Sequence, residues 1–149
     1  MIASRWNALR TALLVLAVLV VPACDDDDPT EPVSLTTADL VGSYAATVFT
    51  VTEDGSVADV LTVGGSLEID LAADNTTSGS LVIPASLSES GTEEILSLAG
   101  TWSLSGSTVT FVQGADTFIR DSDWAASPGR LEAEEDFGGI LIRVVLERI

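Results

Sequence analysis

The chain has 149 residues with 6 Arg, no Lys, no His, one Cys and 23 acidic residues, so its formal net charge is −17. These counts exclude an internal disulfide, a His metal ligand, and catalytic sites built on Ser-His-Asp, Cys-His or a Lys nucleophile. They also exclude a nucleic-acid partner, because phosphate binding needs clustered Lys and Arg.

Residues 1–23 have the features of a secretory signal peptide. Arg5 and Arg10 precede the uncharged apolar run 12–21, which is shorter than the roughly 20 residues that a membrane-spanning helix needs. The segment Val21-Pro22-Ala23-Cys24 follows and resembles the lipobox of bacterial lipoproteins, although Pro22 departs from the usual small residue. The resemblance implies that Cys24 is acylated, becomes the mature N-terminus and anchors the protein in a membrane of the bacterial cell envelope.

Residues 24–37, CDDDDPTEPVSLTT, are expected to be an acidic tether. They contain two prolines, show no apolar periodicity and carry charges that repel one another. In some lipoprotein families acidic residues after the Cys direct retention at the inner membrane, and in others they direct display on the cell surface. The membrane and leaflet therefore stay open.

Residues 38–149 are expected to form a single all-β domain after one helical turn. Thr36 is a candidate N-cap, Asp39 completes a weak capping box three residues later, and Gly42 ends the turn. Beyond Gly42, helical spacing of apolar residues disappears and alternation with period two replaces it.

This alternation predicts eight or nine strands separated by turn residues. The clearest are 66–71 and 96–104, and the others are 43–52, 57–63, 79–84, 108–112, 117–120, 130–135 and 140–146. Turn sequences such as Glu53-Asp54-Gly55 recur at intervals of about 8–15 residues, so sequential strands should be antiparallel. We favour a closed up-and-down barrel of about eight strands over a β-sandwich, because closure removes exposed strand edges.

Two segments support a family resemblance. Leu40-Val41-Gly42-Ser43-Tyr44 resembles the Gly-x-Trp motif that opens the first strand of lipocalins, with Tyr44 in the place of the Trp. Residues 98–111 resemble the mid-barrel hairpin of small bacterial lipocalin-like lipoproteins. The resemblance implies an up-and-down barrel with a small apolar cavity.

The candidate ligand-binding side chains are the aromatic ones that such a barrel would enclose. They are Tyr44, Trp102, Phe111, Phe118 and Trp124. The alternative is that they pack in the core, because a small barrel is filled by its own side chains and leaves room for one small ligand at most.

The acidic residues do not indicate a metal site or a catalytic pair. Ala125 stands where a calcium-binding loop starting at Asp121 would need an oxygen ligand. On a strand, Glu132 and Glu134 point to one face and Glu135 points to the other, so these carboxylates do not converge. We therefore expect no cofactor, no metal and no enzymatic activity. The expected function is a membrane-anchored barrel that binds a small apolar ligand, and the alternative is a sandwich-type adhesion or assembly module that binds an unidentified protein.

Overall fold

Ten antiparallel strands and two short helices make up the part of the chain that the computed structural model describes, residues 34–88 and 90–149. The expected signal peptide, Cys24 and the first ten residues of the expected tether lie outside the described residues. None of the helices within the described range is long and apolar enough to cross a bilayer.

Eight of the strands close into a barrel, so the predicted all-β fold is confirmed and the sandwich alternative is wrong. The circuit consists of β1 (Gly42–Glu53), β3 (Ser66–Leu71), β4 (Thr76–Ile83), β6 (Gly100–Ser105), β7 (Thr108–Gln113), β8 (Trp124–Ser127), β9 (Arg130–Asp136) and β10 (Ile140–Arg148). Pairing of β10 with β1 completes it, from Tyr44 opposite Arg148 to Glu53 opposite Ile140. The apolar C-terminal strand is thereby paired on both sides, as the edge argument predicts.

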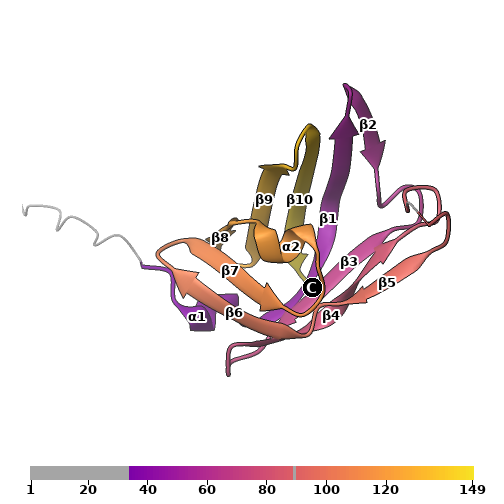
Figure 1. Cartoon of the computed structure of the whole chain (residues 1–149). Coiled ribbons are helices and arrows are strands. Elements are labelled where there is room, and N and C mark those ends of the chain that lie inside the picture. Colours follow the sequence, from indigo (N-terminus) through magenta and orange to yellow (C-terminus); the bar gives the residue numbers. More distant parts are fainter. Residues whose placement is uncertain (1–33, 89) are drawn as a thin grey trace, which may run out of the picture. The chain divides into compact units, whose positions relative to one another are not determined.

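Two further strands lie outside this circuit (Figure 1). β2 (Ser56–Asp59) pairs with the second half of β1, and β5 (Glu94–Ser97) pairs with the second half of β4. The turn between β1 and β2 is a two-residue hairpin in which Asp54 and Gly55 both have positive φ, 48° and 78°. A turn with two left-handed residues is the type whose twist matches that of its strands, and Asp-Gly is one of its preferred sequences.

The predicted strand 96–104 is broken in two at Leu98. The Leu98 side chain is fully buried, and its carbonyl oxygen accepts hydrogen bonds from the Thr77 hydroxyl at 2.7 Å and from the Gln113 amide at 3.1 Å. Its amide N–H donates to the Gly79 carbonyl at 3.1 Å. Side chains of β4 and β7 thus bind the Leu98 carbonyl in place of a backbone N–H of a neighbouring strand. Regular backbone pairing resumes at Gly100.

Two other strand predictions need correction. The predicted strand 57–63 ends at Asp59, because the Asp59 carboxylate accepts hydrogen bonds from the N–H groups of Leu61 and Thr62 and turns the chain. The predicted strand 117–120 is wrong, since residues Phe118–Asp121 form the helix α2. Strand β8, which follows it, was not predicted.

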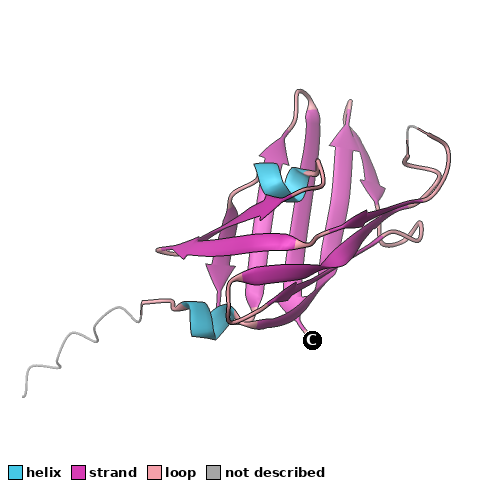
Figure 2. Ribbon diagram, turned by 60° about the horizontal axis from the view of Figure 1, so that its bottom comes forward, coloured by secondary structure: helices cyan, strands magenta, loops and turns pink. Residues whose placement is uncertain are grey.

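The predicted helical turn is confirmed as α1 (Thr37–Leu40). It lies at one end of the barrel. The Asp39 carboxylate accepts hydrogen bonds from the Thr36 N–H at 2.8 Å and from the Thr36 hydroxyl at 2.6 Å. Inside this end, the Tyr44 hydroxyl donates to the Leu40 carbonyl at 2.8 Å, and the Arg148 guanidinium lies 5.5 Å from the centre of the Tyr44 ring. Figure 2 shows α1 and α2 at opposite ends of the barrel.

A bulge in β1 determines which of its side chains face inward. The pairing register with β10 shifts between Ala46 and Val48. Consequently Tyr44, at an even position, and Phe49, at an odd position, are both buried in the core, with exposed fractions of 0% and 4%. A strand of strict alternation would have placed these two residues on opposite faces.

Candidate functional site

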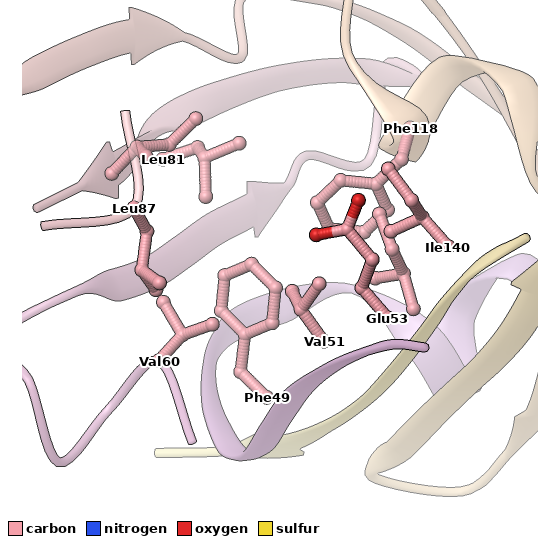
Figure 3. A pocket seen from close by; sticks show the side chains of 10 residues that line it. Phe49, Val51, Glu53, Val60, Leu81, Leu87, Phe118 and Ile140 are labelled. Carbon is pink, nitrogen blue, oxygen red and sulfur yellow. The ribbon is translucent and has the colours of Figure 1, made fainter. Parts of the chain in front are cut away.

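A cavity of about 360 Å³ lies at the end of the barrel opposite α1, and Figure 3 shows the side chains that line it. Nine of the ten residues that line it are apolar, and the tenth is an acid. The lining consists of Phe49, Val51, Glu53, Val60, Leu81, Ile83, Leu87, Phe118, Ile140 and Ile142.

The walls of the cavity come from strand ends. The second half of β1 and the first half of β10 form one wall, in which Val51 is opposite Ile142 and Glu53 is opposite Ile140. The end of β4 supplies two residues of another wall, and Val60 follows β2 with its N–H hydrogen bonded to the Phe49 carbonyl at 2.9 Å. Because most of these side chains stand on paired strands, the cavity is largely formed before any ligand binds.

Helix α2 supplies Phe118, which is held in place by aromatic neighbours. The Phe118 ring lies 5.5 Å from that of Phe49 and 6.5 Å from that of Trp124. Trp124 in turn packs edge-on against Phe111 at 5.9 Å, and its indole N–H donates to the Ile119 carbonyl at 3.1 Å. This hydrogen bond ties α2 to the barrel wall and fixes the position of Phe118.

The structure separates the five aromatic residues that the sequence singled out. Phe118 lines the cavity, and Phe111 and Trp124 are buried in the core next to it. Tyr44 is buried against α1, and Trp102 is buried with its indole N–H donating to the Ala72 carbonyl at 3.1 Å. Neither of these two belongs to the lining.

Most of the lining was not foreseen from the sequence. Val51, Glu53 and the isoleucines of β10 belong to segments that were predicted as strands or turns, but the sequence did not show which of their faces would be enclosed. One hint is present in β10. Ile140 and Ile142 occupy alternate positions directly after the Gly138-Gly139 turn, so their side chains share one face of the strand.

None of the arginines of residues 34–149 lines the cavity, and three of them form ion pairs with acids outside the lining. Arg120 forms ion pairs with Asp116 and Asp121, whereas Arg130 and Arg143 both contact Glu132. No ion pair found among residues 34–88 and 90–149 involves Glu53.

The acidic segment 132–136 is partly compensated by these arginines. Glu132 accepts hydrogen bonds from Arg130 at 3.0 Å and from Arg143 at 3.1 Å, and these contacts lower the pKa of its carboxyl group. Glu134, on the same face of β9, lies 3.6 Å from Arg143. Within the described range no three His, Cys, Asp or Glu side chains come together in a way that could hold a metal ion.

Comparisons of the chain with protein-family models, with curated proteins and with solved structures found no match. The fold and the cavity define its class, which is a small closed β-barrel with an apolar cavity at one end.

Proposed function

We propose that this protein is a non-enzymatic lipoprotein of the bacterial envelope, anchored through acylated Cys24, whose barrel binds a small apolar molecule. The observation that carries the proposal is the cavity of about 360 Å³ with nine apolar residues among the ten that line it. Ligand pockets typically have volumes of about 300–1,000 Å³ and are mainly apolar with a few polar groups.

The expected binding energy comes from removing apolar ligand surface from water. Each methylene group that enters the cavity contributes about 0.8 kcal/mol before the costs of association. Those costs are limited here because the paired strands and the Phe49–Phe118–Trp124 contacts already hold the walls in place.

The place where the chain enters the domain is compatible with a membrane anchor. Ser34 is the first described residue and leads directly into α1, at the end of the barrel opposite the cavity. The residue to which the expected tether is joined is therefore at the other end of the barrel from the cavity.

A titration with a neutral apolar fluorophore such as Nile red tests ligand binding. Val51→Trp should weaken binding at least tenfold, because the indole fills the cavity. Val112→Trp is the matched control, because Val112 is 70% exposed and does not line the cavity. Equal affinities of both variants and the wild type would overturn the proposal. If Val51→Trp weakens binding as expected, lipid extraction and native mass spectrometry of protein from its own host would identify a natural ligand.

A second candidate function is protein binding through the two strands outside the barrel. β2 and β5 carry Val57 and Ile95, whose side chains are 67% and 66% exposed. Large exposed apolar side chains on strands with a free edge are typical of interaction surfaces. If this is the function, Val57→Lys and Ile95→Lys should abolish capture of an envelope protein by cross-linking in the host, and Val51→Trp should leave that capture intact.

A further inference from the structure

One charged group lines the cavity, the carboxylate of Glu53, which is an exposed residue at the mouth. Figure 3 shows it directed into the cavity among the apolar side chains of the lining. A single polar group in an apolar pocket is the feature that fixes the orientation and the chemical class of a ligand.

The inward direction of Glu53 is a consequence of the fold. Because of the bulge between Ala46 and Val48, the odd-numbered residues of the second half of β1 face the interior, and Glu53 is the last of them after Phe49 and Val51. Without that extra residue, Glu53 would be on the outer face with the other acids of the barrel wall.

No cation of the domain neutralises this carboxylate. Three of the arginines of residues 34–149 are engaged in the ion pairs described above. The fourth, Arg148, lies at the opposite end of the barrel over Tyr44. Residues 34–149 contain 4 Arg and 18 Asp or Glu, which is a net charge of −14, so the surroundings repel a second anion.

We infer that the cavity selects an amphiphile with a positively charged head group, such as an alkylammonium compound, and discriminates against fatty acid anions. This inference rests on the proposed function. The apolar body of the ligand lies between the wall of Val51 and Ile142 and the ring of Phe118, and its ammonium group faces the Glu53 carboxylate at the mouth. A fatty acid in the same position would place two carboxylates together in the absence of a counter-ion.

The test is competition of three probes with the same chain, decylammonium, decanol and decanoate, against Nile red on the whole protein. At low salt decylammonium should bind about tenfold more tightly than decanoate, with decanol between them, since a partly exposed charge pair contributes modestly and its reversal costs a similar amount. The difference should shrink in high salt, because the mouth is open to solvent.

Variants of two acids separate the cavity charge from the overall charge. Glu53→Gln should reduce the preference for decylammonium to less than about threefold, whereas Glu53→Asp should largely keep it. Glu68→Gln is the matched control, because Glu68 is an exposed acid on β3 that does not line the cavity. It removes the same charge and should leave the preference unchanged.

The outcomes distinguish the two proposals. If none of the probes displaces Nile red and Val51→Trp has no effect on its binding, the proposed function fails. If the probes bind with equal affinity, or if Glu53→Gln and Glu68→Gln change the preference equally, the cavity is a binding site but the selection of cations by Glu53 is wrong.

Discussion

Trp124 packs in the barrel core and against Phe118 of the cavity lining. Its replacement should therefore lower the free energy of unfolding and also weaken binding in the cavity. The side chain is fully buried, packs edge-on against Phe111 and lies 6.5 Å from Phe118. Its indole N–H donates to the Ile119 carbonyl at 3.1 Å. Trp124→Ala removes all of these contacts and should lower the free energy of unfolding by about 3–5 kcal/mol.

Trp124→Phe separates packing from hydrogen bonding. It keeps an aromatic ring but leaves the Ile119 carbonyl without its donor, a loss of about 1–3 kcal/mol for a buried group. We therefore expect a loss of about 2 kcal/mol for this variant. A domain of this size has a stability of about 5–15 kcal/mol, so Trp124→Phe should remain folded at room temperature and keeps the account testable if Trp124→Ala unfolds.

The assay is urea denaturation followed by far-ultraviolet circular dichroism, analysed by linear extrapolation. Trp102→Ala is the control, because Trp102 is equally buried but does not contact Phe118 or the cavity lining through an aromatic pair. Both alanine variants should lose stability, and only Trp124→Ala should also weaken Nile red binding. A loss below about 1 kcal/mol for Trp124→Ala, or equal binding by both variants, would refute this account of the site.

Three further predictions concern the anchor, the covered end and the barrel wall. Cys24→Ala should move the protein from the membrane fraction to the soluble fraction of its host, and a variant that stays acylated and membrane-bound would contradict the lipobox interpretation. Tyr44→Phe should cost about 1–2 kcal/mol in urea denaturation, because the buried Leu40 carbonyl loses its hydroxyl donor; an unchanged midpoint would show that this bond is dispensable. Gly79→Ala should cost about 2–3 kcal/mol, because the backbone there has φ of +127° and a methyl group would lie 2.1 Å from the Glu68 carbonyl oxygen; a thermal midpoint equal to that of the wild type would count against it.

Much of the fold could be predicted because its signals are local. The alternation of Leu67, Ile69 and Leu71 with two acids gave strand β3 with its observed bounds, and the pair Thr36 and Asp39 gave α1. Each of these signals depends on residues within one strand or one helical turn, where steric preference and capping act directly.

The error at α2 falls where a distant residue contributes to the local structure. A strand was predicted over residues 117–120, whereas Phe118–Asp121 form the helix α2, in which Phe118 packs 5.5 Å from the ring of Phe49 on β1. A four-residue segment has too little periodicity to outweigh such contacts.

By itself the sequence determined that the domain would be an antiparallel sheet with one apolar face, because alternation and turn chemistry are properties of neighbouring residues. Only the tertiary structure decided which end of the barrel is open and which side chains line the opening. The bulge between Ala46 and Val48 exists in the pairing of β1 with β10, whose paired residues Ala46 and Leu146 are 100 positions apart in the chain. Since one extra residue reverses every later side chain of a strand, that distant pairing turns Glu53 inward and gives the cavity its charge.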